Sequence, residues 1–185
     1  MGPLHTWAID SVVRLKPPDP AGRQYLVVCV DVFSKWLEYG ILGELSSDAV
    51  TCWFHENITC RFGVPFSVRC DNGLEYRGDF AKYCEDLGIR RSPVSVNHPQ
   101  ANGLVERYNG CLKSGFRRLK VACPEGNWYD FIADVAAGLR MLPGTVGVSP
   151  YLVVFKQEPH WPISNPAKLV APEATLEEQE DMVEQ

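Results

Sequence analysis

Three acidic residues stand at places in the sequence where carboxylates can do chemistry. Asp10 lies inside a strand-like apolar run, Asp71 follows a short apolar run and precedes an Asn-Gly turn, and Glu106 lies in a long segment with helical periodicity. Ligands collect at strand ends in open α/β sheets, and Mg²⁺ prefers carboxylate oxygens together with substrate phosphates. Two such ions can activate an attacking oxygen and stabilise a leaving one. The three acids therefore suggest metal-dependent phosphoryl transfer.

Other interpretations of these acids are simpler. An aspartate at a strand end is commonly a solvated turn former. Asp31 occupies a strand context similar to that of Asp10, and we expect it to make a structural hydrogen bond. Glu75, four residues after Asp71, could reach the same metal, although an exposed surface acid is the expected role.

The elements that must position the acids follow from hydrophobic periodicity and turn residues. The pattern predicts strands over residues 7–15, 24–33, 36–43, 66–70 and 89–96, and helices over 46–60, 78–87, 102–122 and 128–142. Ser46 or Ser47 is the expected cap of the first helix. The proline-rich chain beyond Pro143 is expected to be irregular. This order of elements is typical of an α/β protein with a mixed sheet.

Several motifs resemble one family. The segment RCDNGLEY followed by HPQANGLVERYN is similar to retroviral and LTR-retrotransposon integrases, especially those of the gypsy type. VVCVDVFSKWLE resembles the second strand of that family, and GVSPYLVVFKQEP resembles its motif after the last core helix. The resemblance covers residues 5–162, and the motifs occur in the family's order.

The resemblance implies a fold, a site and a reaction. It implies a ribonuclease H-like fold, with a mixed five-stranded sheet flanked by helices. Carried over by position, Asp10, Asp71 and Glu106 are the catalytic and metal-binding triad, which holds two Mg²⁺ or Mn²⁺ ions. The implied reactions are 3′-end processing and strand transfer of retroelement DNA. The implied partners are double-stranded DNA and further copies of the chain, as a homodimer or higher oligomer, and the implied location is the nucleus.

The long helix carries the candidate DNA contacts. Asn102, Glu106, Asn109 and Lys113 share one helix face because they lie three or four residues apart. In the family, residues at the positions of Asn102, Asn109 and Lys113 touch element DNA or support the catalytic helix. A basic stripe runs through Lys113, Arg117, Arg118 and Lys120. The stripe is either DNA-facing, with Arg117 as a further DNA-binding residue, or simply the solvated face of a helix.

Two departures from the family pattern keep alternatives open. Thirty-four residues separate Asp71 from Glu106, one fewer than is usual in the family, and Asn97 replaces its usual tyrosine. The alternative function is a domesticated or decayed integrase core that binds DNA or protein without catalysis. A ribonuclease H acting on hybrids would share the fold but not the D-N-G…N-G-x-x-E arrangement.

Composition sets the remaining expectations. The 185 residues carry a net charge of −5, and six of the acids fall between Glu173 and Glu184. We expect a catalytic core domain over residues 1–165 and an acidic, disordered tail over 166–185. The seven cysteines include no C-x-x-C pair, which favours buried, reduced thiols in an intracellular protein. We expect no zinc site, secretory signal or membrane span. We also expect this sequence to contain the core domain alone, without the family's zinc-binding and C-terminal DNA-binding domains.

Overall fold

The computed structural model describes residues 2–12, 14–93, 99–144 and 147–160, with only the backbone given for residues 93 and 99–102. Asn97 and the tail over 166–185 lie outside the described residues, and so does the side chain of Asn102.

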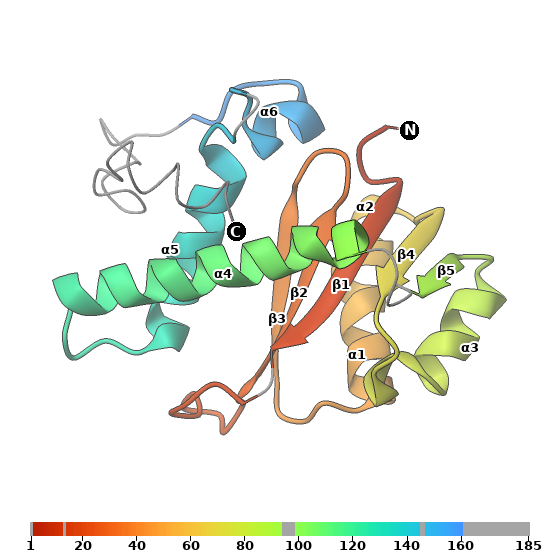
Figure 1. The fold of residues 1–185 in the computed structure, drawn as a ribbon, viewed down its shortest axis with the longest axis horizontal. Coiled ribbons are helices and arrows are strands. Elements are labelled where there is room, and N and C mark those ends of the chain that lie inside the picture. Colours follow the sequence, from red (N-terminus) through yellow and green to blue (C-terminus); the bar gives the residue numbers. More distant parts are fainter. Residues whose placement is uncertain (1, 13, 94–98, 145–146, 161–185) are drawn as a thin grey trace.

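The centre of the fold is a five-stranded mixed sheet (Figure 1), as the sequence predicts. Its order is β3-β2-β1-β4-β5. β1 pairs antiparallel with β2, and β2 with β3, whereas β1 with β4 and β4 with β5 are parallel pairs. The strands are β1 (Thr6–Val12), β2 (Tyr25–Asp31), β3 (Leu37–Leu42), β4 (Ser67–Cys70) and β5 (Arg90–Pro93).

Helices connect and cover the strands. They are α1 (Ser47–Phe54), which continues through the π-helical turn η1 (His55–Thr59) into α2 (Cys60–Phe62), then the 3₁₀ turn η2 (Leu74–Tyr76), α3 (Asp79–Asp86), α4 (Pro99–Ala122), α5 (Trp128–Met141) and α6 (Pro150–Phe155). The Ser46 hydroxyl accepts a hydrogen bond from the Ala49 N–H, so Ser46 caps α1. Among the described residues, no helix is both long and apolar enough to cross a membrane.

The expectation of irregular chain beyond Pro143 is wrong at α6. Ser149 caps this helix by accepting from the Leu152 N–H, and Pro150 is its first residue. A serine followed by proline is a recognised helix start, because proline fixes a helical φ and lacks an N–H that would have no partner there. The signal was therefore present in the sequence.

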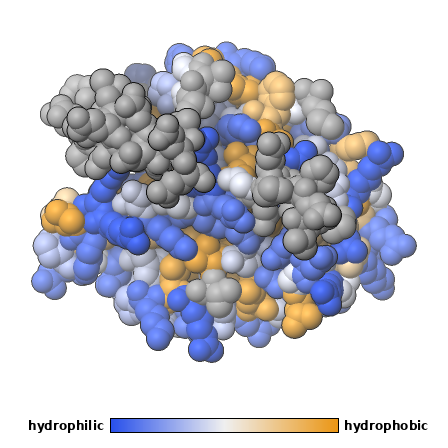
Figure 2. All heavy atoms as spheres, viewed as in Figure 1, coloured by the Kyte–Doolittle hydropathy of each residue, from blue (hydrophilic) through white to orange (hydrophobic). Residues whose placement is uncertain are grey.

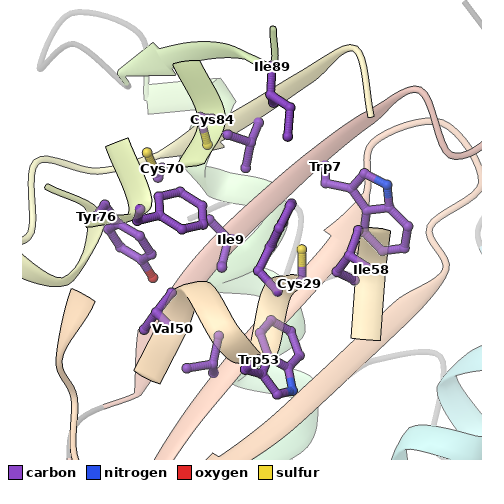
Figure 3. Close-up of a cluster of buried hydrophobic side chains, with 14 of the residues drawn as sticks. Trp7, Ile9, Cys29, Val50, Trp53, Ile58, Cys70, Tyr76, Cys84 and Ile89 are labelled. Atoms are coloured by element: carbon purple, nitrogen blue, oxygen red, sulfur yellow. The ribbon is translucent and has the colours of Figure 1, made fainter. Parts of the chain in front are cut away.

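Two apolar layers lie on opposite faces of the sheet. Trp7 and Ile9 of β1 enter the cluster that packs under α1 and α3, which Figure 3 shows. Ala8, between them, enters the other cluster, which α4 and α5 cover. Successive strand residues point to opposite faces, so Asp10 shares the α4 face with Ala8.

Three aromatic residues that could supply an interface are instead part of the core. Trp53, Trp128 and Phe131 are each buried in the single chain. The Trp53 indole lies against the bare backbone of Gly40 in β3, where a Cβ would overlap it. Their burial within one chain assigns these side chains to the monomer core.

The expectation for the cysteines is half correct. All seven are free thiols, and Cys29, Cys70 and Cys84 are buried. The other four are exposed: Cys52, Cys60, Cys111 and Cys123. Their helical segments place these thiols toward solvent, which an apolar neighbourhood in the sequence did not reveal.

Candidate active site

The parallel pairing of β1 with β4 brings two of the predicted acids together. Thr6 pairs with Ser67 and Ala8 with Arg69. The same register, continued by two residues, sets Asp10 opposite Asp71. Both then point to the α4 face, because side chains alternate along a strand. Adjacent strands lie about 4.8 Å apart, so two carboxylates are expected at one edge of the sheet.

Asp10 is held by two hydrogen bonds. Its Oδ1 accepts from the Ser11 backbone N–H at 2.9 Å, and its Oδ2 accepts from the Asn109 side-chain amide at 2.8 Å. Asn109 lies on α4 and is 8% exposed. Its other amide atom, Oδ1, is buried without a partner among the described residues. The side-chain amide N–H of Asn109 therefore serves to fix the Asp10 carboxylate.

The electrostatics around Asp10 are those of crowded negative charges. Burial raises the pKa of Asp10, and the nearby carboxylates of Asp71, Glu106 and Glu75 raise it further. The hydrogen bond from the Ser11 N–H acts in the opposite direction and lowers this pKa. Such a group of carboxylates gains stability from a cation placed between them.

The turn after β4 positions Asp71. Its Oδ1 accepts from the Gly73 N–H at 2.8 Å. A Cβ on Gly73 would overlap the Glu75 carboxylate and would lie 3.0 Å from Asp71 Oδ1. The bare glycine thus lets the acids of residues 71 and 75 approach one another, and Glu75 remains a rival to Glu106 as third ligand.

Tyr76 anchors this turn to β1, a role that the sequence did not suggest. Its buried hydroxyl lies 2.7 Å from the Ser11 hydroxyl, and its carbonyl accepts from Arg91 at 2.8 Å. An aromatic residue in a mostly polar turn was the available signal. A cavity of about 160 Å³ adjoins the turn and is lined by Cys70, Asp71, Asn72, Tyr76, Arg77 and Arg91.

The predicted DNA-contact residues of α4 divide into two groups. Asn109 is buried, whereas Lys113 and Arg117 are exposed, as is the candidate metal ligand Glu106 on the same helix. At about 1.5 Å of rise per residue, Lys113 and Arg117 lie roughly 10 and 16 Å along the helix from Glu106. Figure 2 shows mainly hydrophilic side chains along the line of α4. Lys120 differs, because its ammonium donates to the Gly126 carbonyl and ties down the turn before α5.

The rival acid Asp31 is structural, as expected. It is 0% exposed, and its Oδ2 accepts from both the backbone N–H and the hydroxyl of Ser34. These bonds fix the turn between β2 and β3.

The charges of Asp71 and Glu106 both act on Asp10, but the three acids do not enclose a metal site. Among the described residues, no three His, Cys, Asp or Glu side chains lie close enough to surround one metal ion. Glu106 is exposed at the side of α4. The arrangement is an open group of carboxylates that an ion and a phosphate could complete.

Sequence comparison identifies relatives of this chain. A family model described as the integrase core domain matches residues 2–99. The chain is 30% identical over 159 residues to the Gag-Pol polyprotein of avian reticuloendotheliosis virus, covering 85% of this chain and 14% of the polyprotein. It is 30% identical over 154 residues to the Pol polyprotein of Radiation murine leukemia virus (strain Kaplan), covering 83% of this chain and 26% of that polyprotein. The chain thus spans a small part of each relative.

Solved structures share the fold. The HTLV-2 integrase catalytic core domain in complex with magnesium, in its trimeric form, aligns with a TM-score of 0.64 at 22% identity, covering 83% of this chain and 97% of that one. The catalytic core domain of BIV integrase aligns with a TM-score of 0.65 at 20% identity, covering 82% and 94%. Both likenesses confirm the ribonuclease H-like fold expected from the sequence. The sequence motifs, the sheet and these matches agree that the chain belongs to the integrase core domain family, alongside segments of retroviral Pol polyproteins.

Proposed function

We propose that this chain is the catalytic core of a retroelement integrase, which performs 3′-end processing and DNA strand transfer by two-metal phosphoryl transfer. The observation that carries the proposal is the arrangement around Asp10. Its strand pairs in parallel with β4, which leads into Asp71, the charge of Asp71 acts on it, and Asn109 of α4, the helix that bears Glu106, fixes it.

The residues fit divalent metal ions of the magnesium type. Asp10, Asp71 and Glu106 offer hard oxygen ligands, which Mg²⁺ and Mn²⁺ accept. Burial and, after it, the neighbouring negative charges raise the pKa of Asp10, and a cation would offset those charges. When bound, two such ions would supply the positive charge that favours the attacking oxygen and the leaving oxygen of an in-line displacement.

The protein's own contribution is to hold these ligands ready. The Ser11 N–H and the Asn109 amide fix both oxygens of Asp10, and the Gly73 N–H fixes one oxygen of Asp71. Glu106 is exposed, so a DNA backbone can reach it. Positioned ligands reduce the reorganisation needed when a phosphate enters.

The partners in this proposal are DNA and further copies of the chain. Lys113 and Arg117, on the exposed side of α4, are proposed to contact DNA phosphates, and Asn102 at its start to contact element DNA. A structural neighbour is a simian T-cell lymphotropic virus intasome with TM-score 0.70 at 22% identity, covering 95% of this chain and 59% of that one, and another is a dimeric HTLV-2 core. These neighbours support DNA binding and oligomerisation. Action on chromosomal DNA would place the protein in the nucleus.

The test compares two glutamates, Glu106 and Glu75, whose charges both act on Asp10. Glu106→Gln and Glu75→Gln each keep the side-chain size and remove one charge. In a Mn²⁺-dependent strand-transfer or disintegration assay, Glu106→Gln should lower the rate by at least about a hundred-fold, since a lost ligand removes several kcal/mol of transition-state stabilisation. Glu75→Gln should remain within about a few-fold of wild type, as expected for an acid that does not hold the metal.

Both variants should melt within a few degrees of wild type, because an accessible Glu→Gln change alters stability by about 0.5 kcal/mol or less. The opposite ranking, at equal melting temperature, would assign the third ligand to Glu75. Wild-type protein that binds DNA yet shows no strand transfer with Mn²⁺ would favour the decayed core, a binding module without catalysis.

A further inference from the structure

A second group of reactive side chains lies on the opposite face of the sheet from Asp10. Cys60 Sγ is 3.4 Å from His55 Nε2, and His55 Nδ1 is 3.1 Å from the Tyr83 hydroxyl. The Tyr83 hydroxyl in turn donates to Thr59 Oγ1 at 2.8 Å. The four side chains form one continuous chain of hydrogen bonds between η1, α2 and α3. The proposed integrase chemistry uses none of them.

The π-helical turn η1 is what brings the cysteine and histidine together. In an α-helix, residues five apart point about 140° away from each other, given 3.6 residues per turn. Here the Cys60 backbone N–H donates to the His55 carbonyl, so the turn contains one extra residue. The wider turn rotates the two side chains onto the same side. Such single π-helical turns occur often at functional sites.

The direction of the hydrogen bonds fixes which nitrogen of His55 carries the proton. Because the Tyr83 hydroxyl gives its proton to Thr59, its oxygen is left to accept from His55 Nδ1–H. Nε2 of the neutral ring is then an acceptor aimed at the Cys60 thiol. The Tyr83 ring packs edge-on against His55, with centroids 5.9 Å apart, and holds its orientation.

Among the described residues, no imidazole is hydrogen-bonded to another exposed cysteine. Cys52 Sγ has the Asp48 carboxylate as its neighbour at 4.0 Å, which offers no positive charge to a thiolate. Burial raises the pKa of the Cys111 thiol. Buried cysteines are out of reach of a reagent: burial raises the pKa of Cys70 to about 11 and that of Cys84 to about 12. Cys60 combines exposure with a neighbouring imidazole.

We propose that Cys60 is a selectively reactive thiol, a covalent modification site for low-molecular-mass disulfides and similar soft electrophiles, with His55 as its base. In the reaction, His55 Nε2 takes the Cys60 proton and the sulfur attacks one sulfur of the disulfide. A new S–S bond to Cys60 forms as the old S–S bond breaks. The leaving thiolate takes the proton back from His55, so Cys60 is oxidised and half of the reagent is reduced.

The test measures alkylation of every cysteine in the same molecule. The full chain is treated with limiting iodoacetamide, quenched at several times, and analysed by peptide mass spectrometry. Cys60 should react about ten-fold faster than Cys52 or Cys123, since the imidazole 3.4 Å from its sulfur can accept the thiol proton as the sulfur attacks. His55→Gln should bring the Cys60 rate down to that of Cys52 and Cys123. Tyr83→Phe, which removes the acceptor for His55 Nδ1 and the donor to Thr59, should lower the Cys60 rate partially.

Unchanged rates at Cys52 and Cys123, with an unchanged melting temperature, are the control for folding in both variants. Glutathione disulfide should then give a mixed disulfide at Cys60 in wild type and markedly less in His55→Gln. Equal rates at Cys60 and Cys52 in wild type would overturn the proposal. So would a Cys60 rate that does not change in either folded variant.

Discussion

Asn109 provides the sharpest test of how the acidic site is built. The family resemblance allows two roles for this residue, contact with DNA or support of the catalytic helix. In the structure it is 8% exposed and donates to Asp10 Oδ2 at 2.8 Å. These two roles predict different defects for Asn109→Ala.

The size of the defect follows from that one bond. A hydrogen bond to a charged group contributes about 1.5–3 kcal/mol, but removing Asn109 also relieves its unpaired Oδ1, whose burial costs about 1–3 kcal/mol. Global stability should therefore fall by only about 1 kcal/mol. Metal affinity should fall more, by about 10–100-fold, because Asp10 loses a partner that orients it as a ligand.

Two measurements separate the roles. Mg²⁺ titration, followed by melting temperature or calorimetry, should show a half-saturating concentration raised about 10–100-fold in Asn109→Ala. Fluorescence anisotropy with labelled DNA in EDTA should show unchanged affinity. The matched control is Lys113→Ala, one turn further along α4 and exposed. This variant should weaken DNA binding and leave the Mg²⁺ titration unchanged. Weakened metal-free DNA binding by Asn109→Ala, with normal Mg²⁺ response, would refute the positioning role.

Three further predictions concern stability. Asp31→Ala leaves the Ser34 N–H and hydroxyl without their acceptor, so it should lower the free energy of unfolding by about 2–4 kcal/mol in urea titrations. A loss below about 0.5 kcal/mol would contradict the structural role given to Asp31. Gly40→Ala forces a Cβ into the Trp53 indole, so it should lower the free energy of unfolding by about 1–3 kcal/mol and alter the tryptophan fluorescence. An unchanged free energy of unfolding would show that the strand and the helix can separate at no cost. Millimolar Mg²⁺ should raise the melting temperature of wild type but not of Asp10→Asn, because a ligand stabilises only the state that binds it; equal rises in both proteins would place the ion elsewhere.

Most secondary structure could be predicted from the sequence because its signals are local. The apolar run around residues 25–31 predicted β2, and Ser46 with the apolar face after it predicted α1. The π-helical turn was not predictable in this way, since it differs from an α-helix by one residue per turn. The candidate acids were likewise found from local motifs: the D-N-G turn at Asp71 and the helix around Glu106.

The sequence by itself determined the family and most of the elements and named three candidate acids, because each of these signals lies in residues that are close together along the chain. Only the tertiary structure decided how they meet. The pairing of β1 with β4 sets Asp10 beside an acid 61 residues away, and Asn109 reaches Asp10 across 99 residues. Ser47, in α1, likewise accepts from the Phe80 N–H at the start of α3, where Gly78 has no side chain to cap that helix. Strand register and packing choose such partners, and a hydrogen bond between distant residues leaves no periodicity or motif in the sequence around either of them.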